Sequence, residues 1–305
     1  MIDFRYHIVS IVAIFLALAV GIVLGSGPLK DDISGFLEAR TAQLAREKVD
    51  LQREVAGLRS ERESAQTYAE LVQPSVVDGL LVAQPVALVL LPGASRDAAD
   101  AVSAAVEEAG GRITERVEIQ DRWIDPEQVD ALGLLAAGLV RGGATTNPYE
   151  LAGQALAGAL VTDNVRLIGQ PYTPSVGILA AFADEGFLKT DQDPLTRAGS
   201  AIVIGSDKTV EDSTSALTPL LAALAADGQG EVVAAPLGSA QPGGIVAAVR
   251  DSDLSAEVST VDRVETAQGV SVTVLALVDD RNGVVGHYGT GPDSDGPAPD
   301  PIPGN

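Results

Sequence analysis

The longest apolar stretch of the chain runs from Ile8 to Leu24 and is interrupted only by Ser10. As a helix its 17 residues rise about 26 Å, at the short end of what spans the hydrocarbon of a bilayer. The stretch is longer than the apolar part of an ordinary signal peptide, and little positive charge precedes it. We therefore predict an uncleaved membrane anchor at residues 1–27, with a cleaved signal peptide as the alternative.

Small residues recur at every fourth position of this stretch, at Ala13, Ala17, Gly21 and Gly25. They share one face of the helix and include a G-x-x-x-G pair, the pattern that lets two membrane helices pack closely. The sequence thus predicts self-association in the membrane. Lys and Arg are nearly balanced on the two sides of the span, so we expect the commoner orientation, with the bulk of the chain outside the cytoplasm. The pattern does not distinguish a cytoplasmic membrane from an outer membrane.

A heptad repeat of apolar residues follows the anchor. Its innermost positions are Leu37, Leu44, Leu51, Leu58, Ala65 and Val72. Lys48 and Arg62 lie at the other inner positions, where two-stranded coils tolerate long basic residues, and Glu54 would face Arg59 of a parallel partner. We predict a parallel coiled-coil stalk at residues 28–73 of a homodimer, ending at Gln73-Pro74-Ser75. The alternative is a single amphipathic helix packed on its own domain.

Strands and helices alternate through residues 74–290. The expected strands are at 86–91, 112–119, 201–204, 231–237 and 258–261, and the expected helices between them are at 95–109, 210–226 and 244–250. Such alternation predicts right-handed crossovers and a Rossmann-like α/β domain with a doubly wound, mostly parallel sheet.

Three further segments complete the domain organisation. A helical insertion at about 125–190 is expected to cover the sheet, with helices near 126–139, 149–160 and 174–187. The stretch 267–278 is ambiguous, because its apolar run suits a strand whereas its neighbours suit a closing helix. The acidic tail at 291–305 is rich in Pro, Gly and Asp and is expected to be disordered.

Composition and charge exclude several classes of function. The chain has 20 Lys and Arg against 42 Asp and Glu, and 12 against 32 in residues 74–305 alone. This argues against binding nucleic acid, which requires clustered positive charge. The absence of Cys excludes disulfides, thiolate metal sites and cysteine nucleophiles. The only Met is Met1, so the usual soft ligands of copper(I) are missing.

Candidate chemistry is sparse. Ligands of doubly wound sheets bind beyond the carboxyl ends of the strands, where this chain places Ser95, Asp207, Ser239 and Asp262. These loops contain no phosphate-binding glycine motif, and ordinary caps and turns are the alternative to a small-ligand cleft. The two His residues lie far apart in the sequence, outside any Ser-His-Asp arrangement. We expect no catalytic residues, no metal site and no cofactor.

Two parts of the sequence resemble one known family. They are the opening F-R-Y-H-I-V-S-I-V-A-I-F-L-A-L-A-V-G-I-V-L-G-S-G and the later T-V-D-R-V-E-T-A-Q-G with G-V-V-G-H-Y-G, which includes Gly286, His287, Tyr288 and Gly289. Over residues 1–291 the chain resembles the actinobacterial MctB-like copper-transporter family with its SteB-like septal members. The resemblance implies an envelope protein linked to copper efflux, in some cases as an outer-membrane channel, or to cell division. It brings no catalytic residues.

The two lines of argument lead to two main hypotheses. In the first, the chain is a non-enzymatic homodimer that presents an acidic α/β domain to an envelope or septal partner. In the second, it supports copper export as a channel or as an accessory to one, and copper ions enter only through the family resemblance. A small-ligand sensor that uses the strand-end loops is a third alternative.

Overall fold

The structure, a computed structural model, describes residues 4–25, 29–140, 145–190, 196–207 and 213–300. The chain divides into two compact units, residues 1–65 and residues 66–305. In the first unit, helix α1 (Phe4–Gly25) contains an apolar segment, Arg5–Gly25, that is long enough to cross a membrane. The expected apolar helix is therefore present.

Helix α2 (Leu29–Val77) continues beyond the predicted end of the stalk at Gln73 and passes through Pro74. Proline lacks the N–H of an internal helical hydrogen bond, so a helix usually ends near it. Here the next residues hold the helix together, because Asp78 N donates to Pro74 O at 3.0 Å and Val77 is fully buried in the core of the second unit. Tertiary packing thus overrides the local signal at Pro74.

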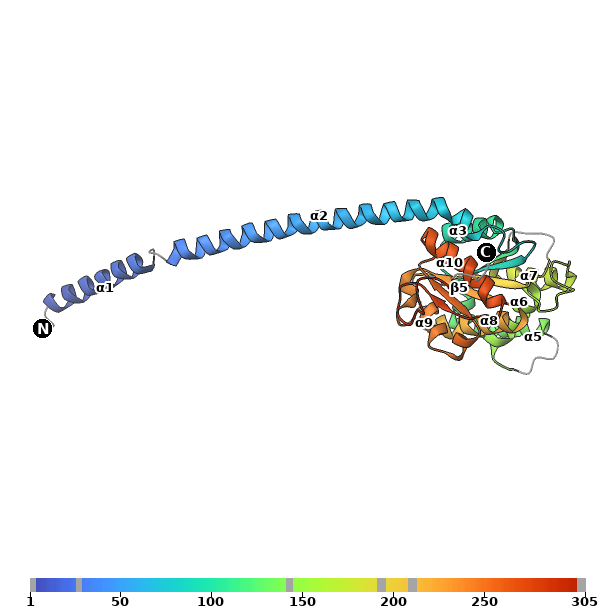
Figure 1. The fold of residues 1–305 in the computed structure, drawn as a ribbon. Helices are drawn as coiled ribbons and strands as arrows, with labels where there is room; N and C mark the ends of the chain where they lie inside the picture. The colour runs from blue at the N-terminus through green and yellow to red at the C-terminus, as the bar shows by residue number, and fades with distance from the viewer. Residues whose placement is uncertain (1–3, 26–28, 141–144, 191–195, 208–212, 301–305) are drawn as a thin grey trace. The chain divides into compact units, whose positions relative to one another are not determined.

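The second unit is a mixed α/β domain built on one seven-stranded sheet (Figure 1). The strand order is β3-β2-β1-β4-β5-β6-β7, and every neighbouring pair is parallel except β2 and β3. The strands are β1 (Pro85–Leu90), β2 (Arg112–Ile119), β3 (Leu188–Thr190), β4 (Ser200–Ile204), β5 (Glu231–Ala235), β6 (Ser259–Asp262) and β7 (His287–Tyr288). The five predicted strands are confirmed, whereas the short edge strands β3 and β7 were not predicted.

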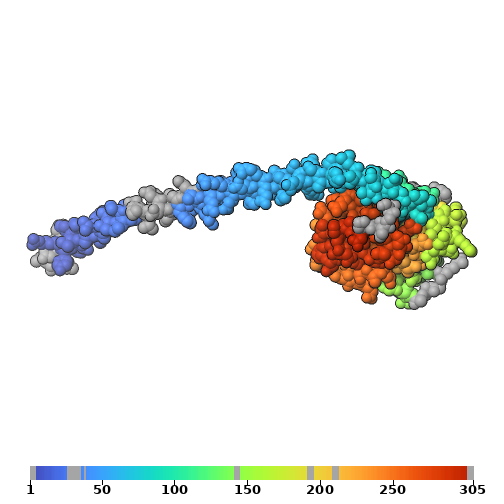
Figure 2. All heavy atoms as spheres, in the orientation of Figure 1, coloured from blue at the N-terminus to red at the C-terminus, as the bar shows by residue number. Residues whose placement is uncertain are grey.

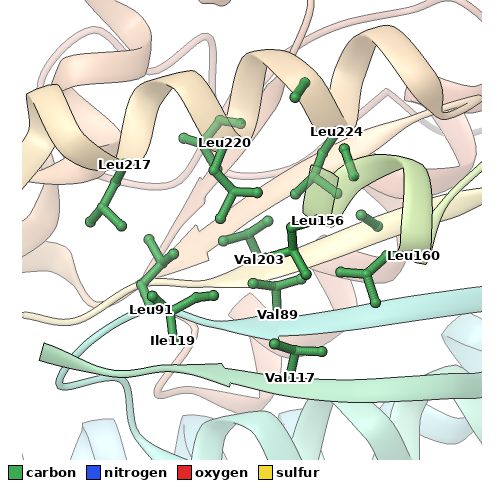
Figure 3. Packing of buried hydrophobic residues seen from close by; sticks show 14 of the residues in the cluster. Val89, Leu91, Val117, Ile119, Leu156, Leu160, Val203, Leu217, Leu220 and Leu224 are labelled. Atoms are coloured by element: carbon green, nitrogen blue, oxygen red, sulfur yellow. The ribbon is translucent and has the colours of Figure 1, made fainter. Parts of the chain in front are cut away.

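Helices cover both faces of this sheet and enclose two hydrophobic clusters. On one face lie α3 (Arg96–Glu108) and α10 (Ala267–Arg281), together with the end of α2. On the other lie α6 (Pro148–Leu160), α8 (Ser213–Asp227) and α9 (Ile245–Arg250). Figure 3 shows Leu217, Leu220 and Leu224 of α8 directed toward the sheet. Successive residues of a strand point to opposite faces of the sheet, and both faces are covered by helices. The central strands are therefore apolar at nearly every position, which explains the continuous apolar runs.

The ambiguous stretch 267–278 is a helix. Thr266 caps α10 by accepting a hydrogen bond from Gly269 N at 3.0 Å, a standard helix N-terminus. Valines suit a strand by intrinsic preference, but those of α10 are buried against β5, β6 and α3. A helix enclosed by the sheet and a second helix is apolar on most of its surface, which hides its periodicity.

The helical insertion contains α4 (Asp121–Ile124), α5 (Val129–Leu139), α6 and α7 (Thr173–Asp184). Its three main helices match the predicted ones, but α7 ends at Asp184 instead of residue 187. Gly186 has φ of +74° and Phe187 N donates back to Phe182 O at 2.9 Å, the geometry of a glycine C-cap. The chain then turns, and buried Phe187 leads into β3.

The described part of the predicted disordered tail is ordered. Gly289 N donates to Gly296 O at 2.8 Å, and Asp295 N donates to His287 O at 2.7 Å. Asp295 and Gly296 therefore lie beside β7, and the orange-to-red C-terminal part forms a continuous face of the domain in Figure 2. Composition alone missed this, because the ordering contacts come from β7 and its neighbours. Residues 301–305 lie outside the described residues.

Candidate functional site

Three of the residues expected at a cleft, Ser95, Asp207 and Ser239, follow β1, β4 and β5, and Asp262 is the last residue of β6. Ser95 caps α3 by accepting from Ala98 N at 3.3 Å, and the buried Ser239 accepts from Val246 N at 3.3 Å. The side chain of Asp207 rests against Gly238, where a Cβ atom would overlap it. Ser95 is thus the N-cap of α3, whereas Ser239 binds the first turn of α9, whose N-cap is Gly244; both roles match the alternative of ordinary caps and turns.

The reversal of strand order between β1 and β4 is where a sheet of this topology offers a ligand crevice. Here the loops after the two strands are in contact, because a Cβ atom on Gly93 would lie 3.4 Å from Ser206 Cβ. A cavity of about 240 Å³ lies instead between the ends of β1 and β2. The Arg96 guanidinium spans it and binds Glu118 through hydrogen bonds of 3.0 and 2.7 Å.

Asp262 forms a buried polar cluster with Arg250 of α9. The Arg250 side chain is 2% exposed and that of Asp262 is 0% exposed, and the two are joined by an ion pair of 3.2 Å. Arg250 also donates from Nε to Thr260 Oγ1 (2.8 Å), from Nη1 to Pro292 O (2.7 Å) and from Nη2 to Tyr288 O (3.1 Å). Asp262 accepts from Thr290 N (2.8 Å) and Gly291 N (3.0 Å). The pair therefore ties α9, β6, β7 and the C-terminal segment together.

His287 and its neighbours in the G-H-Y-G motif belong to the same cluster. Thr260 Oγ1 accepts from Arg250, so its own hydrogen is free to point to His287 Nδ1, 3.0 Å away. Burial and the positive charge of Arg250 lower the pKa of His287, so the ring is neutral at physiological pH. Gly289, at φ +135°, lies where a Cβ atom would overlap the Asp262 carboxyl group. In this structure the motif therefore has a packing role.

A second carboxylate cluster lies at the amino-terminal ends of β5 and β6, opposite the carboxyl end of β6 where Asp262 lies. Asp280 of α10 accepts from Glu231 N (3.0 Å), Ser259 N (3.1 Å) and Ser259 Oγ (2.6 Å). Glu231 is fully buried and its carboxylate oxygens have no hydrogen-bond partner of normal geometry. Burial, followed by the charge of Asp280, raises the pKa of Glu231 well above its ordinary value, and the Ala225 backbone offsets part of that rise.

The sequence analysis did not single out Arg250 or Glu231. A buried charge is recognisable only from its tertiary surroundings, although a Glu as the first residue of an apolar strand was a usable signal for Glu231. Among the described residues, no group of three or more His, Asp or Glu side chains is arranged to hold a metal ion. These clusters tie together the strands and helices of the domain.

Glu231→Gln is expected to stabilise the protein above neutral pH. Because the folded-state pKa of Glu231 is raised, its contribution to stability is fully present below the ordinary Glu pKa of about 4.3 and is lost as pH rises through the folded pKa. The variant should therefore be clearly more stable than the wild type at pH 8 and little changed at pH 4.

Urea unfolding followed by the fluorescence of Trp123 measures this effect. Trp123 is the only tryptophan; it is buried and donates to Ala216 O at 3.3 Å, so its signal reports the α/β domain of the full chain. The exposed Glu257→Gln variant is the control. Equal pH dependence in the wild type and Glu231→Gln would contradict the assignment.

The stalk helix displays the other candidate surface. The side chains of Leu37, Leu44, Leu51 and Leu58 are 56–60% exposed, and all four lie in the part of α2 within the first unit. We call these four residues the leucine seam. Val55 of the same helix face is also exposed, and a groove of about 550 Å³ runs between Leu44 and Arg59. This surface has the apolar face of a coiled-coil strand, and its partner stays a prediction.

The last predicted seam residue, Val72, belongs to the second unit and is half-buried there. Nearby, Gln66 Oε1 accepts from Ala267 N at 3.4 Å and Gln73 Nε2 donates to Glu108 Oε2 at 3.3 Å. This end of α2 thus contacts its own domain, as in the alternative of a helix packed on its own domain. In α1, a Cβ atom on Gly21 or Gly25 would meet nothing within 4 Å, so the small-residue face is uncovered in the single chain.

Comparisons with known proteins agree over nearly the whole chain. A family model described as "Copper transport outer membrane protein, MctB" matches residues 1–299. A protein named copper transporter MctB from Mycobacterium tuberculosis (strain ATCC 25618 / H37Rv) is 32% identical, over 95% of this chain and 97% of the relative. The protein of the same name from Mycobacterium leprae (strain TN) is 30% identical, with the same coverage of both chains.

Proposed function

Because the chain belongs to the MctB family of copper-transport outer-membrane proteins, we propose that it is a non-enzymatic, membrane-anchored envelope protein that supports copper transport through assembly with partners. The observation that carries this proposal is the exposed leucine seam on α2, which directly follows a helix able to cross a membrane. An anchor followed by an unpaired coiled-coil face is typical of a subunit that assembles at a membrane surface.

We propose that the first partner is a second copy of the chain, aligned in parallel. Parallel pairing would place the leucine seams together and Glu54 opposite Arg59 of the other copy, an attractive interchain pair. The inner Lys48 and Arg62 favour two strands over larger bundles, because their charged ends must reach solvent. A parallel stalk also leaves both anchors on the same side, where the faces of Ala13, Ala17, Gly21 and Gly25 would meet.

The paired stalk would present two copies of the acidic α/β domain to an envelope or septal protein. Two linked copies raise the effective concentration for a dimeric or repeated partner. With 12 Lys and Arg against 32 Asp and Glu in residues 74–305, the domain favours a partner surface of positive charge. It would repel anionic lipid, which keeps its surfaces available for protein contacts.

Direct copper binding is not the role that this chain's donors favour. Copper(I) is held by thiolate and thioether ligands, and the sequence has no Cys and no Met besides Met1. The His287 ring already has polar neighbours, Thr260 Oγ1 at 3.0 Å from Nδ1 and the Ser255 backbone. The chain would therefore act on copper export by assembling or positioning the transport path.

A second candidate is that the protein forms the copper path itself. The names of its relatives favour this, since they are called copper transporters and the family is described as one of outer-membrane proteins. One membrane helix cannot enclose a pore, so this role requires several copies or other subunits. Conductance of purified protein in a planar bilayer would support it over the accessory role.

Deleting the gene is expected to raise total copper per cell under mild copper stress, and the wild-type gene should reverse the rise. Copper is measured by mass spectrometry of washed cells. A gene carrying Leu44→Asn, Leu51→Asn and Leu58→Asn should fail to reverse the rise, because assembly through the leucine seam is lost. Val49→Asn changes an exposed apolar residue of α2 outside the seam and should restore normal copper. Unchanged copper in the deletion strain would contradict the role in transport.

A further inference from the structure

A groove of about 690 Å³ lies on the α/β domain between α6, α8 and residues 252–254. This volume falls within the range of small-molecule sites, about 300–1,000 Å³. The groove is lined mainly by apolar atoms, from Pro219, Ala222, Ala223, Ala226 and Leu254. It shares no residue with the two buried charged clusters described above, although Ser252 and Asp253 follow closely after Arg250 in the sequence.

The shape of the groove comes from the close crossing of α6 and α8. A Cβ atom on Gly153 of α6 would lie 2.8 Å from Pro219 O, so the two helices touch through backbone there. Further along, a Cβ atom on Gly158 would lie 3.7 Å from Asp227 Oδ2. Gly153 faces Pro219, and Gly158, further along α6, faces Asp227, further along α8, so the two helices run in the same direction. The small alanine side chains of α8 leave a shallow apolar floor beside this contact.

Carboxylates stand around this floor. Glu150, Asp227 and Asp253 line the groove, and none of the described lining residues is Lys, Arg or His. Glu150 lies near the start of α6 and Asp227 faces Gly158, so the two are separated by about 12 Å along the axis of α6. Burial, followed by the charge of Asp163, raises the pKa of Asp227, and Arg197 partly opposes this. A cation in the groove would relieve that repulsion.

We propose that this groove binds a linear aliphatic diamine or polyamine. Its methylene chain would lie on the alanine floor, and its two terminal ammonium groups would pair with Glu150 and Asp227 at the two ends. An apolar floor suits the methylene groups, whose burial is favourable, and carboxylates of one sign at both ends select a ligand with two positive charges. A neutral or anionic ligand of the same length would lack the ion pairs with Glu150 and Asp227.

The test is calorimetric titration of the full chain, in non-ionic detergent at low salt, with 1,8-diaminooctane. We expect one site per chain, with binding about fivefold tighter than that of 1,8-octanediol, because two partly exposed ion pairs contribute modestly. 1,3-Diaminopropane should also bind more weakly, since it is too short to reach both carboxylates.

Variants locate the site. Glu150→Gln with Asp227→Asn should weaken binding about fivefold, whereas the control pair Glu107→Gln with Glu257→Gln removes the same charge from exposed positions elsewhere and should not. Ala222→Leu with Ala226→Leu fills the groove with good helix formers and should abolish binding, with the unfolding transition of Trp123 unchanged.

Equal weakening by the test and control pairs would mean general attraction to an acidic protein and would overturn the proposal. Binding of the diol as tightly as the diamine would also overturn it. Binding of acetyl-Ala-Lys-Ala-amide in the groove without binding of the diamine would overturn it in favour of a peptide ligand.

Discussion

Purified full-length protein with Leu44→Asn, Leu51→Asn and Leu58→Asn is expected to be monomeric, and the wild type is expected to be dimeric. The three leucines are exposed in the single chain and would be buried between two copies. Burying a leucine contributes about 1.5–3 kcal/mol, so six of them across a dimer contribute on the order of 10 kcal/mol. Their replacement by a polar amide should therefore remove the stalk interface.

Multi-angle light scattering in detergent, with the detergent mass subtracted, measures this change. Val49→Asn is the matched control, because it places the same amide on an exposed apolar position of α2 outside the seam. The comparison should be repeated with Gly21→Leu, so that contacts in the membrane do not mask the loss of the stalk. Persistence of the dimer in the combined variant would contradict the coiled coil.

Charge exchange tests the direction of the stalk. Glu54→Arg should weaken the dimer slightly, since it places two positive charges near each other, and adding Arg59→Glu should restore it only if the helices are parallel. Each exposed pair contributes about 0.5 kcal/mol, so the effect is best measured near the dissociation midpoint. Failure of the double exchange to restore the dimer would argue for an antiparallel arrangement.

Local patterns were sufficient to predict the helices and strands whose signals are local. Ser95 and the glycines after Ala109 define α3 with both its ends, and the apolar run at 86–91 predicts β1 to within one residue. The mostly parallel sheet followed from the alternation of such elements. These features depend on capping and periodicity, which the chain carries in a few consecutive residues.

The remaining features depend on distant contacts. Pro74 ends a helix by every local rule, yet Val77 is held in the core and the helix continues. The tail after Gly291 has the composition of a disordered segment, but Arg250 and Asp262 bind its backbone. Asp262 was selected for its position after a strand, and its partner Arg250 could not be known because the pairing arises only when α9 folds over the sheet.

Those contacts lead to the prediction that Arg250→Ala will destabilise the α/β domain by about 3–5 kcal/mol. The change leaves the fully buried Asp262 carboxyl group without its cation, and removing one member of a buried ion pair costs about this much. It also frees the carbonyl groups of Tyr288 and Pro292, which Arg250 binds. Urea unfolding followed by Trp123 fluorescence in the full chain gives the value, and exposed Arg112→Ala is the control.

The C-terminal segment should respond first. Amide hydrogen exchange is expected to accelerate at Thr290 and Gly291, which donate to Asp262, before the rest of the sheet loses protection. Replacing both members, with Arg250→Met and Asp262→Leu, removes the unpaired charge and should recover part of the lost stability, because apolar replacements of buried pairs are often tolerated. If Arg250→Ala costs no more than Arg112→Ala, or leaves these amides protected, the ion pair does not hold the C-terminal segment, and β7 must be retained by backbone pairing with β6 alone.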